Sequence, residues 1–367
     1  MSDENLDLYR KLQKHFDKMP IGFPTTKSGV DIRILKHLFT PEEAEIAMKL
    51  SFIPKPLKKI YRYVKKSGMS IEELEKILDI MVDKGSINFN KMEDEKYYGN
   101  APFAVGMHEY QVSRLTKEYY EDVVQYIDEA FIDEYVKMGP QIRTIPIEES
   151  ITPEHHIASY NDLVQIMEKK EGPFCVFSCI CRKGKRLIGK PCNQTSRDET
   201  CMTFGNGAQF FIDQGWGRKI SKKEALEILR KNEADGLVLQ PANIRDPGYI
   251  CSCCGCCCDI LVHAKKLVRP IEAFAPSYYA EVDIELCVGC GTCIDRCQMD
   301  ALTLINNIST VNRDRCIGCG LCVTTCPSDA MHLSEIEEEF IPPKNSGELF
   351  LGFVDRKAEL SRVNKNQ

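Results

Sequence analysis

The sequence predicts an α+β protein of several domains: a helical N-terminal domain, a cysteine-rich α/β middle region, and a small C-terminal domain followed by a tail. Helix caps and helical apolar periodicity dominate the N-terminal part. All 19 cysteines lie between Cys175 and Cys326, which sets the later regions apart. A four-cysteine run occurs twice near the C-terminus, so that domain should hold two copies of one unit. The expected boundaries are 1–140, 141–275, 276–335 and 336–367.

Length and charge narrow the function classes. The 367 residues carry a formal net charge of −6, which gives no global attraction to nucleic acid or anionic membranes. No apolar stretch approaches the roughly 18–20 residues that span a bilayer. The polar N-terminus does not resemble a signal peptide. Because the cysteines crowd into motifs, we expect metal ligation in a reducing cytoplasm rather than disulfides.

The N-terminal domain is expected to contain three helices followed by a two-stranded wing. Thr40 precedes Pro41 and two acidic residues, which is typical of a helix start. Ser70 and Glu73 form a capping box at the start of a later helix. This succession predicts a winged helix-turn-helix, with a further long helix behind it. The expected helices span about 40–50, 56–66, 70–84 and 117–137, and the wing strands 87–89 and 97–105.

A winged helix is a DNA-binding fold, but the charges of this one argue against that role. The third helix lacks the Arg, Asn and Gln that read bases, and it is rich in acidic residues: Glu72, Glu73, Glu75, Asp79 and Asp83. The helix before it is basic, so contact with phosphates stays open as an alternative. We expect a protein-docking or structural module rather than a nucleic-acid binder.

The middle region carries a first set of four spaced cysteines. A buried strand is expected over 174–181, and the spacing C-x-C-x10-C-x8-C begins at its end with Cys179, Cys181, Cys192 and Cys201. Four thiolates suit a third [4Fe-4S] cluster or a structural zinc ion. Basic residues after Cys181 would stabilise an anionic cluster, which favours iron–sulfur over zinc. A helix is expected over 221–232.

A second set lies in a run of six cysteines within residues 251–258. Six thiols exceed the ligands of one conventional cubane, so some must serve another cluster, stay free or form an unusual cluster. Because adjacent residues point in different directions, the predicted ligands of this fourth site are Cys251, Cys254, Cys257 and Cys258. Metal binding is not expected of three isolated residues, Cys175, His155 and His156, since lone histidines and buried cysteines are more often structural.

The strongest motif is the doubled run C-x2-C-x2-C-x3-C, the spacing that bacterial ferredoxins use for a [4Fe-4S] cluster. The two copies are Cys287, Cys290, Cys293, Cys297 and Cys316, Cys319, Cys322, Cys326. Extended stretches are expected before each run, at 281–286 and 308–313. A pair of zinc knuckles is the alternative, but this is not a usual zinc spacing.

Residues 280–333 resemble the two-[4Fe-4S] bacterial-type ferredoxin domain. In such domains the fourth cysteine of each run binds the other cluster. The resemblance therefore implies Cys287, Cys290, Cys293 and Cys326 for one cluster, and Cys297, Cys316, Cys319 and Cys322 for the other. One departure is visible: the family usually has proline after the fourth cysteine, as in Pro327, but Gln298 stands in the first run.

The whole order of motifs resembles a multidomain 4Fe-4S dicluster protein family of anaerobic bacteria and archaea. The resemblance implies an electron carrier or an electron-input subunit of a larger redox complex. We expect the protein to relay single low-potential electrons to or from a partner, a flavoprotein or a ferredoxin-linked oxidoreductase. Two alternatives stay open. One is a reductase with its active site at the middle-region cysteines, although no G-x-G-x-x-G or P-loop is present. The other is a redox-sensing DNA-binding regulator.

Overall fold

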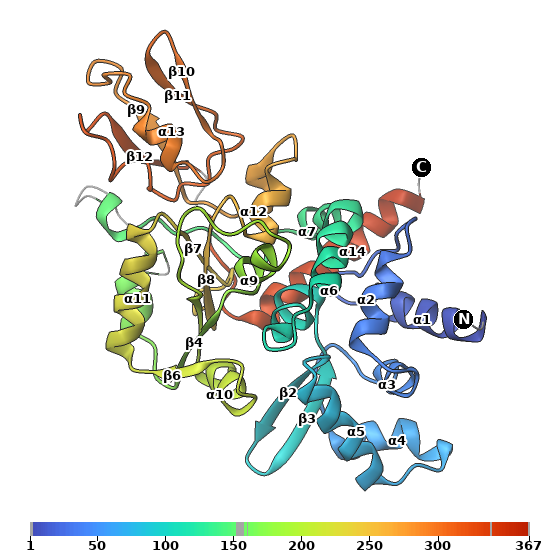
Figure 1. Ribbon diagram of the computed structural model, residues 1–367. Helices are drawn as coiled ribbons and strands as arrows, with labels where there is room; N and C mark the ends of the chain where they lie inside the picture. The colour runs from blue at the N-terminus through green and yellow to red at the C-terminus, as the bar shows by residue number, and fades with distance from the viewer. Residues whose placement is uncertain (1–2, 152–157, 160, 338–339, 366–367) are drawn as a thin grey trace. The chain divides into compact units, whose positions relative to one another are not determined.

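The computed structural model describes residues 3–151, 158–159, 161–337 and 340–365 (Figure 1). His155 and His156 lie outside the described residues. Contacts along the chain define two compact units. Unit 1 comprises Met1–Glu134, Asp213–Trp216 and Lys357–Gln367, and unit 2 comprises Tyr135–Ile212 and Gly217–Arg356. The middle region and the doubled cysteine runs therefore share one unit.

Unit 1 is mainly helical, with one small antiparallel sheet in the order β1-β3-β2. Its strands are β1 (Lys55–Pro56), β2 (Ile87–Met92) and β3 (Glu95–Asn100). Its helices are α1 (Asp3–Phe16), α2 (Val30–Leu38), α3 (Pro41–Ala47), α4 (Leu57–Val64), α5 (Ile71–Asp83) and α6 (Lys117–Tyr126), and a π-helical turn, Ile127–Phe131, joins α6 to α7 (Ile132–Met138). Aromatic side chains dominate its core; Phe23, for example, packs against Tyr126 with ring centroids 4.6 Å apart.

The capping signals of unit 1 act as the sequence predicts. The Thr40 hydroxyl accepts a hydrogen bond from Glu43 N while the Glu43 carboxylate accepts one from Thr40 N. Ser70 and Glu73 repeat this reciprocal pattern at the start of α5. The hairpin also forms, but β3 ends at Asn100 rather than near 105. Pro102, two residues after Asn100, lacks an N–H and limits further pairing. The winged-helix assignment stays a prediction.

Unit 2 is built on a five-stranded antiparallel sheet in the order β6-β4-β5-β8-β7. The strands are β4 (Phe174–Ser178), β5 (Glu199–Phe204), β6 (Arg218–Ile220), β7 (Val238–Pro241) and β8 (Tyr249–Cys253). The accompanying helices are α8 (Leu163–Glu168), α9 (Ile180–Leu187), α10 (Gly205–Asp213), α11 (Lys222–Ala234) and α12 (Asp259–Ala264). Near the C-terminus, α14 (Ser346–Lys365) belongs to unit 2 as far as Arg356 and to unit 1 from Lys357 on. The predicted helix over 221–232 is confirmed as α11, which Ser221 caps. The strand predicted over 174–181 ends earlier, because Cys179 already caps α9.

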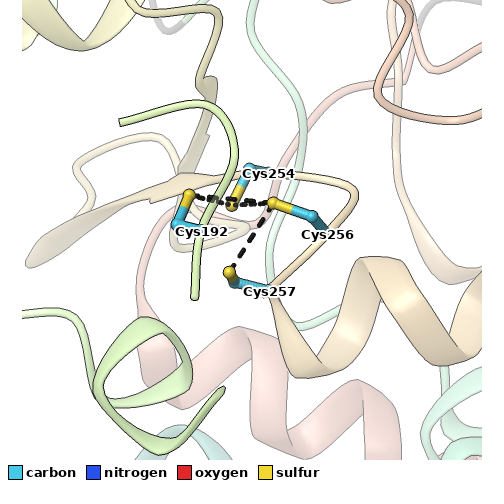
Figure 2. A group of neighbouring side chains, drawn as sticks. All are labelled: Cys192, Cys254, Cys256 and Cys257. Carbon is cyan, nitrogen blue, oxygen red and sulfur yellow. Dashed lines mark hydrogen bonds between the residues drawn. The ribbon is translucent and has the colours of Figure 1, made fainter. Parts of the chain in front are cut away.

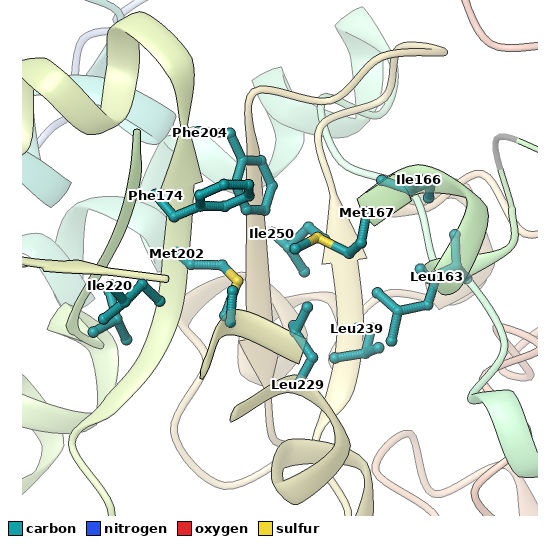
Figure 3. Packing of buried hydrophobic residues seen from close by; sticks show 13 residues of the cluster. Leu163, Ile166, Met167, Phe174, Met202, Phe204, Ile220, Leu229, Leu239 and Ile250 are labelled. Atoms are coloured by element: carbon teal, nitrogen blue, oxygen red, sulfur yellow. The ribbon is translucent and has the colours of Figure 1, made fainter. Parts of the chain in front are cut away.

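One face of this sheet carries the hydrophobic core, and helices α8 and α11 supply its other half (Figure 3). Val176, Met202 and Ile250 point into this core from neighbouring strands. Successive side chains of a strand alternate between the two faces. Cys201, Cys251 and Cys253 therefore point to the opposite face, away from the aliphatic core. Because apolar residues and cysteines alternate along these strands, the apolar side chains lie on the core face of the sheet and these cysteine side chains lie on the other face.

The doubled unit folds into two antiparallel strand pairs, and α13 (Thr292–Arg296) lies between β9 (Tyr278–Val282) and β10 (Leu302–Ile305) in sequence. The pairs are β9 with β12 (Met331–Glu335), and β10 with β11 (Ile308–Val311). β9 and β10 belong to the first copy of the repeat, and β11 and β12 belong to the second, so each of the two sheets joins the copies. The predicted extended stretch at 308–313 is confirmed as β11, whereas β9 lies slightly before the predicted 281–286.

Candidate metal centres

Two cavities in the C-terminal part are lined by cysteine sulfurs. The first cavity is lined by Cys287, Cys290, Cys293 and Cys326. The second cavity is lined by Cys297, Cys316, Cys319 and Cys322. Each cavity therefore gathers three thiols of one run and the fourth thiol of the other run. The structure brings together the same two sets that the ferredoxin resemblance implies.

The backbone around both cavities is arranged as an anion cradle. Ser309 N donates to Cys287 Sγ at 3.4 Å, and Ala280 N donates to Cys316 Sγ at 3.3 Å. These two donors occupy equivalent positions in the two copies. Gly318 has φ of +63°, and a Cβ there would lie 2.1 Å from Tyr278 O, so only glycine lets the loop approach. Four thiols and inward N–H groups fit a [4Fe-4S] cluster, which needs thiolate ligands and hydrogen bonds to sulfur.

The two cavities differ in exposure. Cys290 of the first cavity is exposed, and so are two apolar residues that line the same cavity, Val288 and Leu304. In the second cavity Cys316 and Cys322 are buried. The backbone oxygen of Cys319 there accepts a hydrogen bond from Ile147 N at 3.1 Å. The first cavity thus faces outward, and the second faces the middle region.

In the middle region four thiols form a compact group, which we call the thiol tetrad: Cys192, Cys254, Cys256 and Cys257 (Figure 2). All four sulfurs lie within 4.8 Å of one another. The sulfur of Cys192 is 3.6 Å from that of Cys254 and 3.7 Å from that of Cys256. Cys256 lies 3.6 Å from Cys257. Cys254 and Cys257 are buried, while the other two are partly exposed.

The remaining six middle-region thiols outside β4 form a second group, which we call the six-thiol ring. Its members contact one another in the circular order Cys179, Cys181, Cys258, Cys253, Cys251, Cys201. Contact with Cys181 lowers the pKa of Cys179, but contact with Cys201 and burial raise it to about 12. Within the described part of the chain, no three ring sulfurs lie within 4.8 Å of one another. The ring is therefore wider than the tetrad.

These groups differ from the two middle-region sets that the sequence predicts. Of the predicted third site, Cys179, Cys181 and Cys201 lie in the ring, but Cys192 lies in the tetrad. Of the predicted fourth site, the thiols divide equally: Cys251 and Cys258 belong to the ring, Cys254 and Cys257 to the tetrad. Sequence reasoning assigned no role to Cys253 and Cys256. Cys175 lies in neither group and is buried in β4.

The conformation of the backbone between 254 and 257 explains why the observed thiol groups differ from the predicted sets. The prediction assumed that adjacent cysteines diverge, which holds for an extended chain. Here Cys257 N and Cys258 N both donate to Cys254 O, at 3.3 and 3.0 Å, so the chain turns. The turn brings the adjacent pair Cys256 and Cys257 to the same group. The sequence does contain one sign of the ring. Cys251 and Cys253 are two residues apart on one strand, so their side chains share one face of the sheet.

A buried guanidinium lies between the two thiol groups. Arg182 is 1% exposed and donates to Thr200 Oγ1 at 2.7 Å, to Ser252 O at 3.4 Å and to Cys254 Sγ at 3.8 Å. Among the described residues no carboxylate pairs with it. Burial lowers the pKa of Arg182, but the thiolate charges of Cys179, Cys254 and Cys201 outweigh this effect and raise it. The cation therefore requires anionic sulfur around it.

No helix in the described ranges is both long and apolar enough to cross a bilayer. No curated protein matches the chain, and no solved structure matches it. The chain combines an iron–sulfur domain with a separate cysteine cluster, which indicates a redox or electron-transfer function. The sequence model of one family, described as a 4Fe-4S dicluster domain, matches residues 280–333.

Proposed function

We propose that this protein is an iron–sulfur electron-transfer protein that relays single low-potential electrons between a partner oxidoreductase and its own middle region. The main support for this proposal is that the first cavity is more exposed to solvent than the second. Cys290 places the first cavity at the surface, and Ile147 N contacts Cys319 on the inner side of the second. Two clusters so placed form a directed path, because the first exchanges electrons with an outside partner and the second passes them inward.

The path continues into the middle region through a short contact. Gln298 lines the second cavity, and its side chain contacts the backbone of Gly255 within the tetrad loop. The tetrad adjoins the ring through the peptide bond between Cys253 and Cys254. We propose that the ring holds a third cluster at the inner end of this path. Its six thiols exceed the four ligands of a cubane, and its width suits a polynuclear cluster.

The partner is proposed to be a flavoprotein or a ferredoxin-linked oxidoreductase that docks at the first cavity. Val288 and Leu304 line this cavity and are 68% and 40% exposed, which gives an apolar rim around an exposed cluster ligand. We further propose that α3 to α5 with the β2–β3 hairpin form a winged-helix-like docking module. Because the cysteines are gathered into groups that suit metal ligation rather than disulfides, the protein is proposed to act in the reducing cytoplasm of an anaerobe.

Metal content and reduction kinetics test this function. Anaerobically purified full-length protein should contain at least about eight iron and eight sulfide ions per chain; fewer than about four iron ions would refute the proposal. A low-potential ferredoxin should reduce the wild-type chain rapidly. In Cys290→Ala the same donor should reduce the remaining clusters more slowly. In Cys175→Ala, which changes a buried cysteine outside all four groups, the rate should be unchanged.

The size of the six-thiol ring favours one second candidate, a reductase with its active site there. Cys251 and Cys258 lie close enough to Tyr135 that, after burial, their thiolate charge is a further cause of its raised pKa. A phenol beside a thiolate-rich cluster can donate a proton to a bound substrate. Multiple turnovers of an added small oxidant, lost in Tyr135→Phe with the cluster spectra unchanged, would select this candidate over simple relay.

A further inference from the structure

The thiol tetrad has the dimensions of a site for one metal ion. Its sulfurs are 3.5 to 3.7 Å apart where they contact. A tetrahedral ion with metal–sulfur bonds of about 2.3 Å holds its four sulfurs about 3.8 Å apart. A cubane holds its ligand sulfurs farther apart, because each binds a different iron atom. The tetrad therefore matches a single ion.

The C-terminal cavities of the same chain provide an internal comparison. Among the residues that the structure describes, no three of their eight sulfurs lie within 4.8 Å of one another, although each cavity gathers four. Those sets are spread apart, as a cubane requires. Two kinds of four-thiol site thus occur in one chain, and only the tetrad is contracted.

We propose that Cys192, Cys254, Cys256 and Cys257 bind one zinc ion in a closed structural site. Four soft thiolates leave no open coordination position, which is typical of structural rather than catalytic zinc. Zinc also binds such ligands more tightly than ferrous iron does. The ion joins two segments that are far apart in sequence, since Cys192 lies 62 residues before Cys254. Zinc has no redox chemistry, so this site is not a relay station.

The surroundings of the tetrad fit this ion. A zinc ion with four thiolates carries a net charge of −2, and Arg182 donates to Cys254 Sγ at 3.8 Å. The guanidinium therefore offsets part of the buried negative charge. The turn at 254–257 already orders three of the ligands, so binding the ion mainly fixes Cys192 against them. Zinc would thereby hold Gly255 in place against Gln298 and set the spacing between the second cavity and the ring.

Metal analysis and zinc X-ray absorption test the proposal on anaerobically purified full-length protein grown with iron and zinc. We expect one zinc per chain in addition to iron, bound by four sulfurs at about 2.3 Å, without an iron neighbour. Cys256→Ala should lose this zinc while the two C-terminal clusters keep their spectra. Cys290→Ala and Cys175→Ala should both keep it.

Three results would overturn it: no bound zinc in the wild-type protein, zinc with nitrogen or oxygen ligands, or zinc that is lost from Cys290→Ala instead. The absorption spectrum of the wild-type protein identifies the zinc ligands even if Cys256→Ala does not fold. The proposal is independent of electron transfer, since a chain with zinc but without iron would refute only the proposed function, and a chain with iron but without zinc only this inference.

Discussion

Gln298 accepts a hydrogen bond from Gly255 N through its side-chain Oε1, at 2.8 Å. Gln298 directly follows Cys297 of the second cavity, and Gly255 stands between two cysteines of the tetrad. Gln298 is 4% exposed, so the acceptor side of this bond is shielded from water, while Gly255 is half-buried. The residue that departs from the usual proline of the ferredoxin motif is therefore one of those that join the C-terminal domain to the middle region.

Gln298→Ala should weaken this junction. The substitution leaves Gly255 N without its acceptor in a shielded place, which costs about 1–3 kcal/mol. We expect the midpoint of anaerobic denaturant unfolding, followed by cluster absorbance, to fall accordingly while iron content stays constant. Gln194→Ala is the control and should leave the midpoint unchanged, because the Gln194 side chain donates to its exposed neighbour Asn193. Equal unfolding midpoints for Gln298→Ala and Gln194→Ala would show that the hydrogen bond between Gly255 and Gln298 does not stabilise the junction.

Gly255→Ala should be more damaging than Gln298→Ala. A Cβ at this position would lie 2.2 Å from the backbone oxygen of Gln298, and backbone cannot move aside as a flexible side chain can. The loop must shift, so the tetrad should lose bound metal. Gly248→Ala is the matched control, because nothing lies within 4 Å of its added Cβ. Metal analysis compares the metal content of Gly255→Ala with that of Gly248→Ala. Full metal content in Gly255→Ala would show that the loop adapts to the added methyl group.

The sequence predicted what depends on local or repeated signals. The caps at Thr40 and Ser70 are local, so the helices they begin were predicted correctly. The ligand sets of the two cavities follow from one repeat and a known domain. The division of the middle thiols depends on which strands are neighbours and where the chain turns. The proximity of Cys201 to Cys251 follows from the pairing of β5 with β8, which no spacing in the sequence reveals.

The first cluster should be lost before the second on exposure to air. Its ligand Cys290 is exposed, and hydrogen bonding to Thr292 lowers the pKa of that thiol, which further favours oxidation of any released ligand. Cys316 and Cys322 of the second cavity are buried. Electron paramagnetic resonance of samples reduced after timed air exposure should show one cluster signal decaying first. The surviving signal should match that of Cys290→Ala, and a match to Cys319→Ala would reverse the assignment.

Arg182→Gln should make the middle-region cluster harder to reduce. The substitution removes a buried positive charge that lies among the sulfurs of both thiol groups, so an added electron is less well stabilised. We expect the reduction potential to fall by at least about 59 mV, a tenfold change for one electron. Arg186→Gln on the same helix is the control, because Arg186 is exposed and pairs with Asp198. Anaerobic potentiometric titration measures both, and equal potentials would exclude a role for the buried charge.

Glu233 should make unit 2 less stable as pH rises. It is 7% exposed, and burial raises the pKa of its carboxyl from 4.5 to about 7. Below pH 4.5 the group is protonated in both states. Between about pH 5 and 7 the unfolded chain ionises while the folded chain keeps its proton, so the free energy of unfolding falls by about 3 kcal/mol.

Glu233→Gln cannot ionise and should flatten this decline, whereas Glu227→Gln, on the exposed face of the same helix, should retain it. Anaerobic unfolding midpoints at pH 5.5, 6.5 and 7.5 compare the three proteins. Glu148 N donates to Glu233 Oε1 at 3.0 Å, so the amide oxygen of glutamine can keep the same bond. A stability difference between Glu233→Gln and wild type that does not change with pH would show that packing, rather than the buried carboxyl's ionisation, governs this site.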